Sequence, residues 1–197
     1  MVAAQNYLDG RIALITGGFT GIGKAIAIAL AERGATIAVG SRHVNLPVVN
    51  EFKAITDRVF YQTLDVSNTD SISDFILALG KQYGPADILV NSAGISTHEL
   101  VCDHDEQSWL DVIDVNLSGP WWVAKAAVPA FETAGKGKLV IISSVAAMMP
   151  DPDTTPAYNA AKAGLHGLVM ALAGELEGRG ILVNAIAPGS TGTTGTP

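Results

Sequence analysis

Short apolar runs alternate with longer helix-like segments along almost the whole chain, and this alternation constrains the fold more than any other feature. The apolar runs predict six strands, at Ile12 to Thr16, Thr36 to Ser41, Val59 to Leu64, Asp87 to Asn91, Lys138 to Ser143 and Ile181 to Ile186. The segments between them predict helices at Gly21 to Arg33, Leu46 to Ile55, Asp70 to Tyr83, Asp105 to Thr133 and Pro156 to Gly178. Strands joined by helical crossovers form a parallel sheet that is covered on both faces. We therefore predict a doubly wound α/β fold, which binds ligands at the carboxyl ends of its strands.

The long helix over Asp105 to Thr133 contains two prolines, Pro120 and Pro129. A proline inside a helix removes one backbone hydrogen bond and clashes with the preceding turn. We therefore expect a kink or break near Gly119-Pro120.

The composition fits one domain over residues 1–197, because the chain has 197 residues of which 48% are hydrophobic and 16% charged. No apolar stretch reaches the roughly 20 residues that span a bilayer, and residues 1–10 lack the features of a secretory signal. The single cysteine, Cys102, fits a reducing compartment. These features predict a cytoplasmic protein without a membrane partner, and the net charge of -7 argues against nucleic-acid binding.

A glycine-rich segment connects the first predicted strand to the first predicted helix. It reads Thr16-Gly17-Gly18-Phe19-Thr20-Gly21-Ile22-Gly23. Glycines there permit a tight turn and a close approach of a pyrophosphate to the helix N-terminus. This interpretation makes Gly17, Phe19, Thr20, Gly21, Ile22 and Gly23 cofactor-binding residues. A ligand-free glycine turn is the alternative interpretation.

Ser41 and Arg42 stand at the end of the second predicted strand, where an acid recognises the ribose 2′-hydroxyl of NAD. A carboxylate there would repel a 2′-phosphate, whereas a hydroxyl beside a guanidinium binds it by charge-assisted hydrogen bonds. We therefore expect NADP(H) in preference to NAD(H). A solvated surface arginine is the alternative interpretation of Arg42.

Tyr158 and Lys162 are four positions apart and so lie on one face of the last predicted helix. An adjacent ammonium lowers the pKa of a phenol and makes it a better general acid and base. Ser143 and Ser144 end the fifth predicted strand, and a hydroxyl there could stabilise charge on a substrate oxygen. Ordinary turn chemistry is the alternative for the serines.

These motifs together resemble the short-chain dehydrogenase/reductase family over nearly the whole chain. They occur in the family's order, as Thr16-Gly17-x3-Gly21-Ile22-Gly23, Asp65-Val66, Asn91-Ser92-Ala93-Gly94, Asn116, Ser144, Tyr158-x3-Lys162 and Pro188-Gly189. Ser92 departs from the second asparagine that the family usually carries.

The resemblance implies a role for each matched residue. Tyr158 would be the acid and base, Lys162 would bind the nicotinamide ribose, Ser144 would position the substrate oxygen, and Asn116 would hold a water. Asp65 and Val66 would hold the adenine, and Asn91, Ala93 and Gly94 would line the central part of the cofactor. The residues implied to border the nicotinamide are Pro188, Gly189, Thr191 and Thr193.

Two departures leave alternatives open. The loop between Ser144 and Tyr158 is one residue longer than is common, so Ser143 stays a candidate beside Ser144. The family usually continues beyond Pro188-Gly189 into a lid and a last strand, so we expect the sequence to be a piece of a longer protein.

Asp151 and Asp153 are interpreted as solvated loop acids, and we expect no metal.

The sequence thus predicts an NADP(H)-dependent alcohol dehydrogenase or ketone reductase that acts on a small secondary alcohol or carbonyl compound. The resemblance implies a homodimer or homotetramer. The alternative function is a dinucleotide-binding regulator or scaffold without turnover.

Overall fold

The computed structural model describes residues 6–97, 101–149 and 155–192 and contains a parallel sheet of six strands. The strands are β1 (Ile12–Thr16), β2 (Thr36–Ser41), β3 (Val59–Thr63), β4 (Ile88–Asn91), β5 (Gly137–Ile142) and β6 (Ile181–Ile186). Their order across the sheet is β3-β2-β1-β4-β5-β6, so the order reverses between β1 and β4. The predicted doubly wound sheet is confirmed, and each strand lies within one or two residues of its predicted position.

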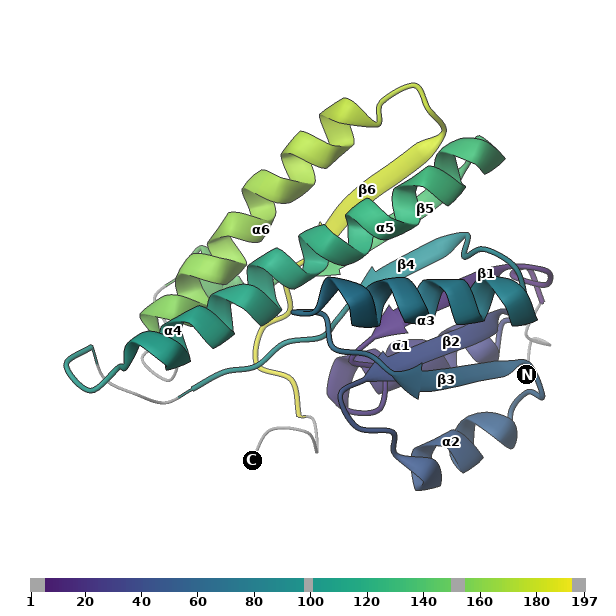
Figure 1. Ribbon diagram of the computed structural model, residues 1–197, viewed down its shortest axis with the longest axis horizontal. Coiled ribbons are helices and arrows are strands. Elements are labelled where there is room, and N and C mark those ends of the chain that lie inside the picture. The colour runs from purple at the N-terminus through teal and green to yellow at the C-terminus, as the bar shows by residue number, and fades with distance from the viewer. Residues whose placement is uncertain (1–5, 98–100, 150–154, 193–197) are drawn as a thin grey trace.

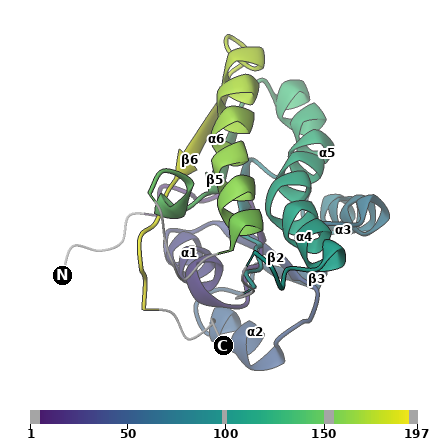
Figure 2. The ribbon, with the colours of Figure 1, turned by 90° about the vertical axis from the view of Figure 1, so that its left-hand side faces the viewer.

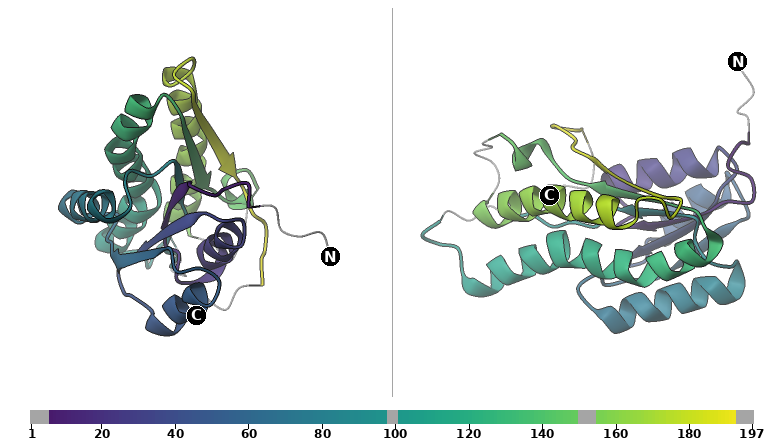
Figure 3. Two further views of the ribbon diagram at one scale, coloured as in Figure 1. Left: turned by 90° about the vertical axis from the view of Figure 1, so that its right-hand side faces the viewer. Right: turned by 90° about the horizontal axis from the view of Figure 1, so that it is seen from above.

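Helices cover the two faces of the sheet (Figure 1 and Figure 3). One face packs against α1 (Gly21–Ala31) and α2 (Leu46–Lys53), with Ile15, Val39 and Phe52 at the centre of the core. The other face packs against α3 (Thr69–Gln82), α5 (Gly119–Ala134) and α6 (Pro156–Glu175). Burial of both faces explains why the strands are apolar throughout rather than alternating.

The predicted long helix contains a change of helix type, and Figure 2 shows the two α-helical parts in line beside α6. It consists of α4 (Glu106–Ile113), a π-helical turn at Asp114–Ser118 and α5. Pro120 lies in the first turn of α5, where no helical N–H is needed. The distortion expected near Gly119-Pro120 is therefore present as a π turn directly before Pro120 rather than as a break, and such turns often mark functional sites.

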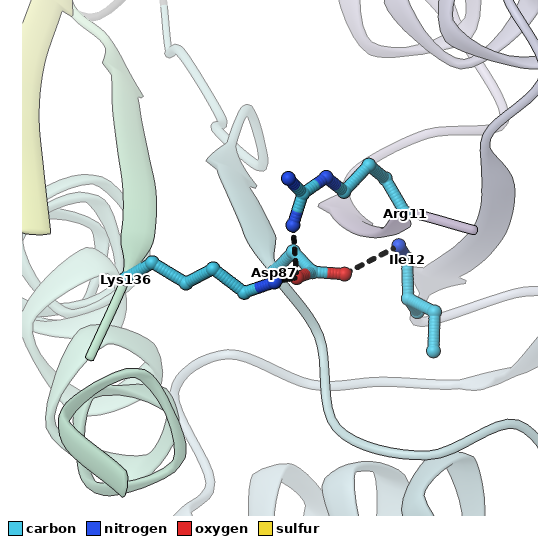
Figure 4. A network of polar contacts seen from close by, with 4 residues as sticks. All are labelled: Arg11, Ile12, Asp87 and Lys136. Atoms are coloured by element: carbon cyan, nitrogen blue, oxygen red, sulfur yellow. Dashed lines mark hydrogen bonds and ion pairs between the residues drawn. The ribbon is translucent and has the colours of Figure 1, made fainter. Parts of the chain in front are cut away.

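Asp87 connects three strands at the amino end of the sheet (Figure 4). Its carboxylate accepts hydrogen bonds from Arg11 Nη1 at 3.1 Å and from the backbone N–H of Ile12 at 3.0 Å. Lys136, just before β5, lies 3.7 Å from the same carboxylate. This ion-pair network holds β1, β4 and β5 together at the end opposite the predicted ligand site.

β6 lies at the edge of the sheet, and within the described residues it pairs only with β5. Leu182 and Ile186 of this strand are 57% and 52% exposed. In the part of the chain that the structure describes, no helix is long and apolar enough to cross a membrane.

Candidate active site

The glycine loop after β1 packs directly on the turn after β4. Gly17 and Gly21 have φ values of 67° and 50°, which side chains other than glycine rarely adopt. A Cβ on Gly17 would lie 2.8 Å from Ala93 Cα. The Thr16 hydroxyl oxygen accepts hydrogen bonds from the N–H groups of Ser92 and Ala93, both at 3.1 Å. The two loops therefore form one rigid floor at the point where the strand order reverses.

Two adjoining cavities open on this floor. The first has a volume of about 690 Å³ and is lined, among others, by the predicted residues Gly17, Phe19, Thr20, Ser41, Arg42, Asp65, Val66, Ala93 and Gly94. The second, of about 700 Å³, is lined by the predicted residues Gly17, Thr20, Gly21, Ile22, Gly23, Arg42, Ala93, Gly94, Ser144, Tyr158, Lys162, Pro188, Gly189 and Thr191. Because residues of the glycine loop and Arg42 line both, the cavities form one elongated site.

Three predicted residues are not among those that line the cavities. Asn91 is 2% exposed, and its amide donates to the carbonyl of Pro120 at 3.1 Å, so its side chain holds the start of α5. Asn116 is fully buried beside the cavity floor. Thr193 lies outside the described residues, as do Asp151 and Asp153.

Asn116 stands in the π-helical turn and holds the loop after β4. Its Oδ1 accepts from the N–H of Ile95 at 3.1 Å, and its Nδ2 donates to the carbonyl of Ile95 at 2.7 Å. A Cβ on Gly94 would lie 2.7 Å from Asn116 Oδ1 and 3.7 Å from Lys162 Nζ. The π turn thus brings Asn116 close to Lys162, and only a glycine fits between these groups and the cavity.

Tyr158 and Lys162 lie on α6, as the spacing predicts. Thr155 caps this helix by accepting a hydrogen bond from the N–H of Tyr158 at 3.4 Å. Lys162 Nζ lies 5.5 Å from the centre of the Tyr158 ring and donates to the carbonyl of Ile142 at 2.9 Å. The ammonium is almost fully enclosed, with 5% of the residue exposed. Burial lowers the pKa of Lys162 to about 8, because the charged form has lost its water.

Ser143 and Ser144 point to different partners. The Ser143 hydroxyl donates to the carbonyl of Lys162 at 3.1 Å and lies 3.0 Å from His166 Nε2, so it is engaged with α6. The Ser144 hydroxyl oxygen accepts from the N–H of Ala146 at 3.1 Å. A hydroxyl that accepts this bond still has its hydrogen to donate. Ser144 therefore has the free donor of the two, in the same cavity as Tyr158.

Asp65 borders the first cavity in a fixed orientation. Its Oδ1 accepts from the N–H of Ser67 at 3.0 Å and from the Ser67 hydroxyl at 2.6 Å. His43 and Asn45, in the segment after β2, also line this cavity, and sequence reasoning did not single them out. Their polar character directly after a strand is the signal that could have identified them.

The chain is similar in sequence and structure to known dehydrogenases and reductases. A family model described as short chain dehydrogenase matches residues 11–196. The 3-oxoacyl-acyl-carrier-protein reductase FabG of Thermotoga maritima is 38% identical over 184 residues, which are 92% of this chain and 74% of the relative. The FabG protein of Staphylococcus aureus strain Mu50 is 40% identical over 182 residues, or 91% and 74% of the two chains.

Solved structures agree with these sequence matches. A variant of actinorhodin polyketide ketoreductase with NADPH superposes with a TM-score of 0.89 at 32% identity, over 93% of this chain and 72% of that one. The match of the family model, the identity to the reductases and the shared fold lead to one conclusion. The chain belongs to the short-chain dehydrogenase/reductase family.

Proposed function

We propose that this member of the family is an NADP(H)-dependent oxidoreductase that interconverts a secondary alcohol and a ketone, with Tyr158 as general acid and base. The observation that carries the proposal is the joint position of Ser144, Tyr158 and Lys162 on one cavity that continues along the glycine loop. A glycine turn without a ligand would not require such a cavity.

The shape and chemistry of the elongated site fit a dinucleotide. Gly17, Thr20 and Arg42 border both cavities, so a pyrophosphate at the start of α1 could connect an adenosine half and a nicotinamide half. Asp65 and Val66 would hold the adenine, while Lys162, Pro188, Gly189 and Thr191 would surround the nicotinamide end. A bound nicotinamide dinucleotide supplies or accepts the hydride.

The protein's own side chains handle the proton. Ser144 would donate its free hydroxyl hydrogen to the substrate oxygen and stabilise the charge that develops there. Tyr158 would give a proton to that oxygen during reduction and take it back during oxidation. Lys162 is mostly charged at pH 7 with a pKa of about 8, so its ammonium favours the phenolate that Tyr158 becomes after giving its proton.

The adenosine end supports NADP(H) over NAD(H). No carboxylate follows β2, where Ser41, Arg42 and His43 line the first cavity instead. A guanidinium binds a phosphate by paired, charge-assisted hydrogen bonds. A structural relative of the chain, the actinorhodin polyketide ketoreductase variant, was solved with NADPH.

The substrate is proposed as a small carbonyl compound or secondary alcohol, and the curated relatives carry the name of a 3-oxoacyl reductase.

We also propose a homodimer or homotetramer assembled through α4, α5 and α6. Trp109, Leu110 and Met170 on these helices are 39%, 43% and 75% exposed, which suits a surface that another copy covers. All six strands lie in one sheet, which supports one catalytic unit over residues 1–197.

The proposal is tested by adding NADPH or NADH and a panel of ketones, including short 3-oxoacyl thioesters, to the purified protein. Binding is followed by quenching of tryptophan fluorescence and turnover by nicotinamide absorbance. We expect tighter NADPH than NADH binding and oxidation of NADPH with at least one ketone. Tight binding without turnover on any ketone would support the regulator instead, and absence of binding would contradict the dinucleotide site.

A further inference from the structure

Two consecutive residues, Ile142 at the end of β5 and Ser143 in the loop after it, hold the turn of α6 that contains Lys162. Ile142 accepts the hydrogen bond of the Lys162 ammonium through its carbonyl at 2.9 Å. Ser143 reaches the backbone of the same lysine, because its hydroxyl lies 3.1 Å from the carbonyl of Lys162. Ser143 is itself fixed, since its N–H donates to the carbonyl of Ile186 at 2.7 Å. Both ends of Lys162 are thus held at the carboxyl end of one strand.

His166 completes this arrangement from the next turn of α6. Its Nε2 lies 3.0 Å from the Ser143 hydroxyl oxygen, and Ser143 is 3% exposed. A hydroxyl has one hydrogen to donate, and the carbonyl of Lys162 can only accept. With the Ser143 hydrogen donated to the carbonyl of Lys162, the contact with His166 is a hydrogen bond when His166 donates from Nε2 to the Ser143 oxygen.

The His166 side chain also gives Ser143 and Ser144 different roles. Ser143 borders the same cavity as Ser144, Tyr158 and Lys162. A Ser143 side chain released from His166 could rotate toward that cavity, where it would compete with Ser144 for a substrate oxygen. It would also give up its hold on the Lys162 backbone.

We infer that His166 is a positioning residue, which holds Ser143 on the backbone of Lys162 and thereby keeps the Lys162 ammonium aligned and leaves Ser144, rather than Ser143, to bind substrate. This inference rests on the proposed function, because it assigns His166 a task in the service of Lys162 and Ser144. His166 acts through Ser143 and is not itself expected to touch the substrate.

Three substitutions test the inference in the full chain. His166→Gln keeps an N–H donor near the position of Nε2, whereas His166→Asn carries its donor near the position of Nδ1 and His166→Leu has none. We expect kcat to fall about tenfold in His166→Leu and His166→Asn, as a small misplacement of catalytic groups does. We expect KM and the NADPH dissociation constant to change less than twofold. His166→Gln should recover most of the lost kcat.

Ser143→Ala supplies the double-mutant control. If His166 acts through Ser143, adding His166→Leu to Ser143→Ala should change kcat by less than twofold, because paired residues are not additive. A further tenfold loss in the double variant would overturn the inference. So would wild-type kcat in His166→Leu, or equal losses in the glutamine and asparagine variants.

A second measurement does not depend on turnover. Competitive acetylation of lysines, read by mass spectrometry across a pH series, reports how well Lys162 is enclosed. We expect Lys162 to become several times more reactive at pH 7 in His166→Leu and not in His166→Gln, with similar melting temperatures. Unchanged labelling in His166→Leu would contradict the positioning role even if the proposed ketone chemistry fails.

Discussion

The Lys162 ammonium donates a 2.9 Å hydrogen bond to the carbonyl of Ile142 while it is almost fully enclosed by protein. It also lies over the Tyr158 ring, and no carboxylate in the described residues forms a salt bridge with it. A buried charge without a counter-ion carries a desolvation cost. The protein thus keeps a destabilising buried charge at the site where the proposed proton chemistry takes place.

Replacing Lys162 by Met should therefore stabilise the free protein while it abolishes turnover. Burial lowers the pKa of Lys162 from 10.5 to about 8. A pKa lowered by one corresponds to about 1.4 kcal/mol, and the lost bond to Ile142 offsets about 1 kcal/mol of the gain. We expect an increase of about 2 kcal/mol in the free energy of unfolding at pH 7, measured with urea.

The gain should depend on pH with a defined sign. Below pH 8 both states carry the charge, so the folded wild type bears the full cost. Between pH 8 and 10.5 the folded protein has lost the proton and the unfolded chain has kept it, so wild-type stability rises with pH. The advantage of Lys162→Met should shrink over this window.

The control Lys81→Met removes an exposed lysine and should change stability by less than about 0.5 kcal/mol. A Lys162→Met protein less stable than the wild type would contradict the claim that the buried charge is destabilising.

Gly94→Ala should disturb the site because a Cβ would lie 2.7 Å from Asn116 Oδ1. Asn116 has little freedom to move, since both ends of its amide bond the backbone of Ile95. We expect a loss of about 1–3 kcal/mol in stability, typical of overpacking, and a fall in turnover. The matched control is Gly167→Ala on α6, where a Cβ meets nothing within 4 Å. Its stability should be unchanged or higher, as for an alanine in a helix.

Arg42→Ala should weaken NADPH binding far more than NADH binding, because the guanidinium would pair with the 2′-phosphate that NADH lacks. We expect a loss of about 2 kcal/mol, or roughly thirtyfold, in NADPH affinity by fluorescence titration. Arg42→Lys keeps the charge without the paired donors and should fall between the two. Equal losses for the two cofactors would show that Arg42 does not read the phosphate.

Asp87→Ala should lower stability and leave cofactor affinity unchanged, because Asp87 is at the opposite end of the sheet from the cavities. The substitution removes the acceptor of the Ile12 N–H and the partner of Arg11. We expect a loss of about 1–3 kcal/mol by urea unfolding. Glu132→Ala, which breaks the exposed pair with Arg179, should cost less than about 1 kcal/mol. A changed NADPH dissociation constant in Asp87→Ala would contradict this separation of roles.

The strands and the location of the site could be predicted because they depend on local signals. Apolar runs defined β1 to β6, and the loops after β1, β4 and β5 had to meet at one edge because the strands are parallel. A distortion before Pro120 followed from proline chemistry, whereas its form as a π turn rather than a break depends on how α5 packs. A single sequence has no signal for that packing.

The different tasks of neighbouring polar residues could not be predicted from spacing. The motif order favoured Ser144 and left Ser143 as a second candidate, until the structure placed Ser143 on His166 and the Lys162 carbonyl. His166 is four positions after Lys162 in the sequence, but its contact with Ser143, just after β5, exists only in the folded chain. Asn91 likewise contacts α5 instead of lining the cavity, because alternate residues of a strand point to opposite faces.

The claim that Tyr158 moves the proton is tested most directly by Tyr158→Phe, which removes one hydroxyl and keeps the ring beside Lys162. The measurement is kcat with NADPH and the best ketone of the panel, together with the NADPH dissociation constant of the same protein. We predict a fall in kcat of at least about a hundredfold, as expected for loss of a general acid, with NADPH affinity changed less than threefold. A Tyr158→Phe protein that reduces the ketone at the wild-type rate would contradict the assignment.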